Sequence, residues 1–220
     1  MNSDQLLIRR LECLDDVPLK HASQVMQSQL KSHPIGCVNW PTVADYKPEA
    51  SFCVASSSNA LFVHFNVVEE GLRAMNTENR SPVAEDSCVE FFLQTPGSEE
   101  YWNFEFNCIG TLNASHRKTR PQPVRLSDQQ MASVGRFASL GSQPFEKREG
   151  QNHWTLTIRI PFDLIGLDAS KSPAAIKANV YKCGSKAQHP HYLSWMPIHT
   201  QRPDFHQPSA FGTMNLEEEK

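Results

Sequence analysis

Two glutamates, Glu90 and Glu105, are the residues whose type and spacing most directly suggest chemistry. They lie in two short segments of alternating apolar residues, 88–93 (CVEFFL) and 102–108 (WNFEFNC). Alternation with a period of two is typical of strands that bury one face, and the Pro-Gly step between the segments is a turn signal. The sequence therefore predicts a hairpin that carries both carboxyl groups on its polar face.

The register of this hairpin follows from pairing its two apolar faces. If Leu93 lies opposite Trp102, then Glu90 lies opposite Glu105, and the remaining pairs are Phe91 with Phe104, Val89 with Phe106, Phe92 with Asn103 and Cys88 with Asn107. Directly opposed carboxylates destabilise a sheet, so a cation, a shared proton or a ligand with hydroxyl donors has to offset their repulsion. A register slipped by two residues, or a solvated surface with water between the acids, is the alternative, because alternation fixes parity but not register.

Short alternating segments of this kind recur along the chain, at residues 50–54, 60–68, 154–160 and 176–180, whereas a helix is predicted only at 19–30. The pattern predicts an all-β fold, an immunoglobulin-like or jelly-roll β-sandwich of antiparallel strands with long loops. We expect a single domain over residues 1–220, with 1–36 as an N-terminal extension or edge segment. The connections at 109–150 and 184–213 are long enough to be loops that line a site.

Composition excludes several classes of function. The 21 basic and 24 acidic residues leave no polyelectrolyte surface for nucleic acid, and no run approaches the roughly 20 apolar residues of a membrane span. Because Met1–Gln5 starts no secretory signal, we expect a cytoplasmic protein, or a periplasmic or secreted one if a leader has been removed. The six scattered cysteines form no C-x-x-C pair and are predicted to be buried free thiols.

Several blocks of the sequence occur together in a known order. They are EDSCVEFF at 85–92, YWNFEFNCIGT at 101–111, WTLTIRIP at 154–161, NVYKCG at 179–184 and PHYLSWMPI at 190–198. Over roughly residues 38–216 the chain resembles the family nine carbohydrate-binding modules, and more closely the stand-alone family-nine-like proteins of gut Bacteroidetes. The resemblance implies a non-catalytic β-sandwich that holds a sugar or oligosaccharide between aromatic rings, with polar side chains on the hydroxyls. A glycan-degrading enzyme would then be the expected protein partner.

The resemblance also assigns site residues by position. The glutamate of the family's D-S-V-E strand corresponds to Glu90, the polar positions of the next strand to Glu105 and Asn107, and the late sugar-stacking tryptophan to Trp195. The family's first tryptophan corresponds to Ala84, which cannot stack on a sugar.

Two departures and two additions complete the predicted site. Glu105 stands where the family carries an arginine, and Trp40 could replace the ring lost at Ala84 if the N-terminal segment folds over the same face. Arg159 and Asn179 are expected to add hydrogen bonds to the ligand. For Trp195 the alternative is a core position beside a proline.

Three other functions start from the same sequence. Glu90 and Glu105 could be a glycosidase pair, but cross-strand Cβ atoms lie only about 4.5–5.5 Å apart and leave little room for a substrate. A structural or interaction domain that has lost sugar binding is the second alternative. The third is a metal site at histidines that otherwise form ordinary loop hydrogen bonds, namely His189, His191, His199 and His206. No cofactor is predicted beyond a structural calcium at acidic loop residues such as Asp86 or Glu99.

Overall fold

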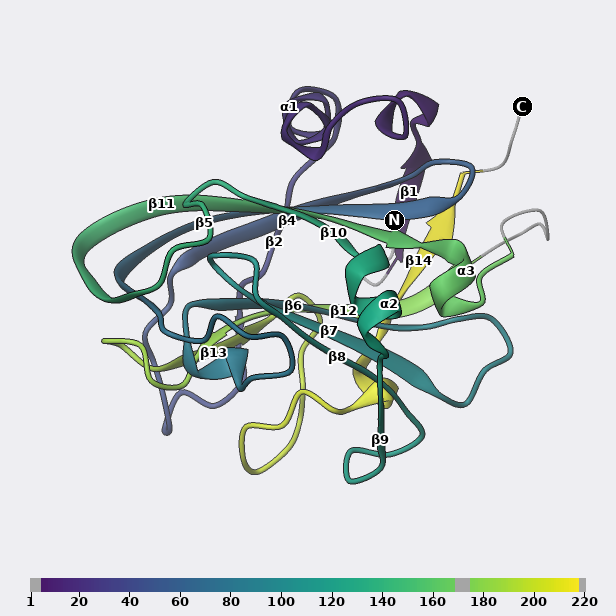
Figure 1. The fold of residues 1–220 in the computed structure, drawn as a ribbon. Helices are drawn as coiled ribbons and strands as arrows, with labels where there is room; N and C mark the ends of the chain where they lie inside the picture. Colours follow the sequence, from purple (N-terminus) through teal and green to yellow (C-terminus); the bar gives the residue numbers. More distant parts are fainter. Residues whose placement is uncertain (1–4, 169–174, 218–220) are drawn as a thin grey trace.

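The computed structural model describes residues 5–168 and 175–217, so the first four residues, on which the signal-peptide prediction partly rests, lie outside it. Its strands form two layers, one above the other in Figure 1. One layer contains β10 (Gly135–Ala138), β11 (Phe145–Pro161), β5 (Ala60–Ala74) and β4 (Glu49–Ser56) in that order. The other contains β14 (Gly212–Leu216), β12 (Ala175–Gly184), β6 (Cys88–Gln94), β7 (Tyr101–Asn107), β8 (Leu112–Arg117) and β9 (Pro123–Arg125).

Strand β1 (Gln5–Arg10) joins the two layers. Its residues 5–8 pair in parallel with β14, and its residues 9 and 10 pair in parallel with β4. The protein is therefore mainly β with a large mixed sheet, and the expectation of purely antiparallel strands is wrong. The expectation of an N-terminal edge segment is also wrong for β1, which has a neighbour on either side. Leu6 and Ile8 of β1 are buried and Leu7 is exposed, but the apolar run of these three residues does not alternate in the sequence and carries no information on strand direction.

Each of the alternating segments found in the sequence is a strand. They correspond to β4, β5, β6, β7, β11 and β12. The predicted helix is α1 (Leu19–Gln29), which covers the outer face of β4 and β5 through Ala22 and Met26 (Figure 1). No described helix is long and apolar enough to cross a bilayer.

The connection at 109–150 is not a loop, which corrects the sequence prediction. It holds β8, β9, β10, the start of β11 and helix α2 (Asp128–Ser133), which begins with a capping box between Ser127 and Gln130. Its strands escape detection because they are short and rich in polar residues. The connection at 184–213 contains β13 (His191–Ser194) and the 3₁₀ turn η3 (Pro208–Ala210), and much of the rest is irregular. Short elements complete the fold: β2 (His33–Pro34), β3 (Cys37–Val38), η1 (Glu12–Leu14), η2 (Val83–Glu85) and α3 (Phe162–Ile165).

The main core lies between the layers and encloses a charged pair. Large side chains from both layers meet there, among them Trp154, Phe65, Phe91 and Phe104. Within this region Lys182 Nζ lies 3.0 Å from Glu69 Oε2 and 2.7 Å from His191 Nε2. The indole nitrogen of Trp154 donates to Glu69 Oε1 at 2.8 Å. Since Lys182 and Glu69 are buried, their charges stay inside only because each neutralises the other.

Candidate functional site

Strands β6 and β7 form the predicted hairpin in the predicted register. Glu90 pairs with Glu105, Leu93 with Trp102 and Cys88 with Asn107. Val89, Phe91 and Leu93 point into the core between the layers, so Glu90 and Glu105 point to the outer face of this layer. The slipped register is excluded.

A cavity of about 250 Å³ opens over this outer face. Glu90 and Glu105 both line it, although they are only 3% and 8% exposed. The other lining residues come from strand ends and connections: Ala84, Arg120, Cys183, Ser185, Tyr192, Pro203, Asp204, Phe205 and His206. Two opposed carboxyl groups therefore meet aromatic and charged side chains in one recess.

A ladder of amides fixes Glu105. Its Oε1 accepts from Asn103 Nδ2 and its Oε2 from Asn113 Nδ2, both at 2.9 Å. Asn103 Oδ1 in turn accepts from Ser115 Oγ at 2.8 Å and from Arg117 Nε at 2.7 Å. Burial raises the pKa of Glu105, and the hydrogen bond from Asn113 opposes that rise.

Glu90 lies in a less polar setting beside two thiols. Cys183 Sγ donates to Glu90 Oε1 at 3.1 Å, and Cys88 Sγ lies 4.0 Å from the same oxygen. Burial raises the pKa of Glu90 well above its ordinary value, and the neighbouring Cys183 and Glu105 raise it further. A proton on Glu90 would remove the repulsion that this register otherwise creates between the two carboxylates.

Ordered aromatic rings form another side of the cavity. Phe205 stacks on Tyr181 with centroids 4.3 Å apart, and Tyr181 Oη donates to the Phe205 carbonyl. His206 Nδ1 lies 2.9 Å from Tyr101 Oη, and burial lowers the pKa of His206 to about 4. The ring of His206 is therefore neutral near pH 7. Tyr192, the remaining aromatic residue of the lining, lies beside Phe205.

Asn107 and Asn179 are placed away from the cavity lining. Asn107 is buried and its amide donates to Asn76 O and Asp86 Oδ2, while its Oδ1 accepts from the Thr111 amide. Asn179 is buried too, and its amide donates to Met196 O and Ala210 O. The polar groups of both side chains were expected to bind a ligand. They are instead occupied by hydrogen bonds that hold connecting segments in place.

Arg159 and Trp195 also lie outside the lining. Arg159 belongs to β11 in the opposite layer, where its guanidinium donates to Asp15 and Asn59. Trp195 packs against the main core and meets Phe52 edge-on at 5.7 Å. Neither residue therefore lies with Glu90 in the cavity lining, and Trp195 is half-buried at the edge of the main core.

The hypothesis that Trp40 replaces the aromatic ring missing at Ala84 agrees with the structure only in part. Ala84 lines the cavity, at the position assigned to the family's first tryptophan. Trp40 does reach the outer face of β6, where it packs with Phe92 and Phe205, but it is 4% exposed and donates to Thr200 O. Trp40 therefore packs against the aromatic side chains of the cavity and exposes no ring face to a ligand.

Three of the residues suggested for metal sites have other partners. Both carboxylate oxygens of Asp86 accept N–H donors, from Arg73, from Asn76 and Asn107 and from the Met75 amide, so Asp86 does not fit a calcium ligand. Glu99 is exposed and pairs with Lys118. His191 accepts from Lys182.

No periodic pattern in the sequence predicts the lining residues that come from connections. Arg120 and Asp204, which form a 3.1 Å ion pair, and Phe205 and His206 carry no periodic signal. The available signal was the length of the connection at 184–213, which was expected to line a site and supplies most of these residues.

Comparisons with known proteins agree with one another. The sequence model described as "Carbohydrate-binding family 9" matches residues 20–216. A crystal structure of a Bacteroides uniformis protein, described as a candidate carbohydrate-binding protein, has a TM-score of 0.92 and 34% identity over 97% of this chain and 99% of that one. Two structures of a family 9 carbohydrate-binding module from Caldicellulosiruptor kristjanssonii, each 11% identical, are similar in fold. The complex with glucose has a TM-score of 0.63 over 98% of this chain and 97% of that one, and the complex with cellotriose has 0.60 over 98% and 95%. No protein with a curated description matches the chain.

Proposed function

Because the chain belongs to carbohydrate-binding family 9, we propose that it binds a sugar, without catalysis, in the cavity lined by Glu90 and Glu105. The observation that carries this proposal is the meeting of two opposed carboxyl groups with the rings of Tyr192 and Phe205 in one recess. Ligand sites combine apolar and aromatic walls with a few fixed polar groups in this way. Protonated Glu90 can donate to a sugar oxygen, and ionised Glu105 can accept from a hydroxyl.

The size of the cavity favours one sugar unit. Its volume of about 250 Å³ lies below the roughly 300–1,000 Å³ of pockets for drug-sized ligands. An oligosaccharide would then insert one end residue and leave the remainder in solvent. Glucose and cellotriose, the ligands of the C. kristjanssonii module, are the natural first probes.

The arrangement argues against a glycosidase. Such enzymes place two carboxyl groups on either side of the scissile bond, whereas Glu90 and Glu105 project in the same direction from adjacent strands. We also propose that the two layers form the sandwich expected for the family, with the cavity on an outer face.

Calorimetric titration with glucose and cellotriose tests the proposal. We expect binding by the unchanged protein and at least tenfold weaker binding by Tyr192→Ala, which removes an aromatic wall. Glu90→Ala should bind about two- to tenfold more weakly, because a hydrogen bond from an uncharged carboxyl group contributes roughly 0.5–1.5 kcal/mol. Tyr46→Ala is the matched control, since Tyr46 is a half-buried tyrosine outside the cavity lining. Binding that both cavity variants retain would place the sugar elsewhere, and an absence of heat with a wide panel of neutral sugars would refute the function.

A further inference from the structure

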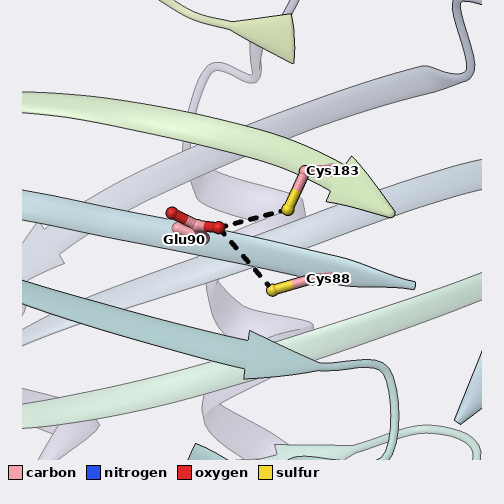
Figure 2. A group of neighbouring side chains, drawn as sticks. All are labelled: Cys88, Glu90 and Cys183. Atoms are coloured by element: carbon pink, nitrogen blue, oxygen red, sulfur yellow. Dashed lines mark hydrogen bonds between the residues drawn. The ribbon is translucent and has the colours of Figure 1, made fainter. Parts of the chain in front are cut away.

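Two cysteines and a glutamate converge at the edge of the cavity. Cys88 and Cys183 are directly opposed across the antiparallel pair of β6 and β12, and Glu90 follows two residues after Cys88 on the same face. Figure 2 shows the three side chains pointing toward one another from these two strands. All three are buried, with exposed fractions of 3% or less. The sheet register therefore holds two sulfur atoms and one carboxylate oxygen together without any contribution from a mobile loop.

We propose that Cys88, Cys183 and Glu90 form a binding site for a zinc ion. One ligand atom from each residue lies within 4.8 Å of the other two. Tetrahedral zinc, with Zn–S near 2.3 Å and Zn–O near 2.0 Å, holds its ligand atoms about 3.5–3.8 Å apart. The distances from Glu90 Oε1 to the sulfur atoms of Cys183 and Cys88, 3.1 and 4.0 Å, lie on either side of this range. Shifts of about half an ångström in the side chains would bring both distances to the ideal value.

The charges around the cluster favour a cation. Glu105 is the direct cross-strand neighbour of Glu90. Among the described residues, no lysine, arginine or histidine forms an ion pair with either glutamate. Lys182, the neighbour of Cys183 along β12, points to the other face and pairs with Glu69. The charges of Arg117 and Arg120 lower the pKa of Glu105, but neither guanidinium forms an ion pair with it. A divalent ion that displaces the protons of Glu90 and of the two thiols would supply positive charge in direct contact with these groups.

The ligand set selects the metal. Thiolates favour zinc and copper(I), and a carboxylate ligand favours zinc, which is the harder of these two ions. A set of two sulfur ligands and one oxygen ligand is therefore better suited to zinc. Glu90 and Cys183 line the cavity, which gives the ion an entry path and leaves its fourth position open to water. The other buried cysteines, Cys53 and Cys108, belong to no such cluster among the residues described here.

Metal titration of the full chain tests the site. The protein is kept reduced, its six thiols are counted, and bound metal is removed with a chelator. We expect one Zn²⁺ per chain in competition with a chromophoric chelator, and one Co²⁺ per chain with the near-ultraviolet charge-transfer band of thiolate ligation. Cys88→Ala and Cys183→Ala should each weaken Zn²⁺ binding about 100-fold or more and remove most of that band, and Glu90→Gln should weaken binding about tenfold. Cys53→Ala, which removes another buried thiol, should bind as the unchanged protein does.

The outcome is decided by the unchanged protein even if a variant folds poorly. Fully reduced protein that binds no Zn²⁺ at stoichiometric concentrations, or a Co²⁺ spectrum without a thiolate band, would overturn the proposal. So would a thiolate band that persists in folded Cys88→Ala, as judged by circular dichroism. The titrations are made without sugar, and sugar binding is measured separately on chelator-treated protein, so that failure of the zinc site and failure of the sugar site are distinguishable.

Discussion

Replacement of Lys182 by methionine should destabilise the protein strongly. Lys182 and Glu69 are both buried in the core, and the Lys182 ammonium also donates to His191 and to the Cys183 carbonyl. Lys182→Met keeps most of the side-chain volume but leaves the Glu69 carboxylate without its counter-charge. Breaking a buried pair in this way costs roughly 3–5 kcal/mol in the free energy of unfolding.

A double-mutant cycle separates the pair from its setting. Glu69→Gln leaves the lysine unpaired and should also cost roughly 3–5 kcal/mol, whereas Glu69→Gln with Lys182→Met leaves no buried charge in the pair. The glutamine can still accept from the Trp154 indole, so the double variant should cost only about 1–2 kcal/mol, much less than the sum of the single variants.

Urea unfolding at pH 7, followed by circular dichroism, measures all three variants. Lys177→Met is the matched control on the same strand, because the ammonium of Lys177 donates to Thr213 near the surface, and its replacement should change the free energy of unfolding by no more than about 0.5 kcal/mol. Single variants that cost less than about 1 kcal/mol, or a double variant whose cost equals the sum, would refute the assignment of Lys182 and Glu69 as a charged, mutually dependent pair.

Three further predictions concern pH and packing. The folded-state pKa of Glu90 is raised, so the folded protein retains a proton that the unfolded chain releases above about pH 4.5. The free energy of unfolding should therefore fall as the pH rises above about 4.5. Urea unfolding of Glu90→Gln from pH 5 to 9 should show a smaller fall than that of the unchanged protein. Burial lowers the pKa of His64 to about 4, so the unfolded chain binds a proton before the folded protein does as the pH falls below about 6.5. The free energy of unfolding of the unchanged protein should therefore fall by about 3 kcal/mol between pH 6.5 and 4, and His64→Gln should not show that loss. Trp195→Ala should cost roughly 3 kcal/mol in urea unfolding through lost core packing, and titration of the folded variant should show sugar binding as in the unchanged protein.

The hairpin could be predicted from the sequence because its apolar side chains are large and strictly alternating. Phe91 and Phe104 can lie on the same face only in registers of one parity, and the structure then distinguishes the predicted register from the one slipped by two residues. Strand β1 could not be assigned to its neighbours in the same way. Its parallel pairing with β14 joins the two ends of the chain, and no local pattern specifies a partner about 200 residues away.

Asn179 was predicted as a site residue because a polar residue on the outer face was assumed to face solvent. That face is covered by Trp40 and by the connection at 184–213, so the polar side chains beneath have to satisfy backbone groups. Asn179 does this for Met196 and Ala210. A buried asparagine and a ligand-binding asparagine have the same sequence pattern, and only the path of the covering chain distinguishes them.

The same covering chain determines which part of the hairpin remains open to a ligand. Phe92 lies two residues from Glu90 on the same face, yet it is buried under His206 and Tyr181, whereas Glu90 and Glu105 line the cavity. The hairpin register supplies the opposed carboxyl groups, and residues 203–206 supply the shape around them. For the proposed sugar site we therefore expect selectivity among sugars to depend on the connection, and the hydrogen-bonding capacity to depend on the strands. With alanine at position 84, the aromatic part of the proposed site consists of Tyr192 and Phe205, and its polar part consists of Glu90 and Glu105.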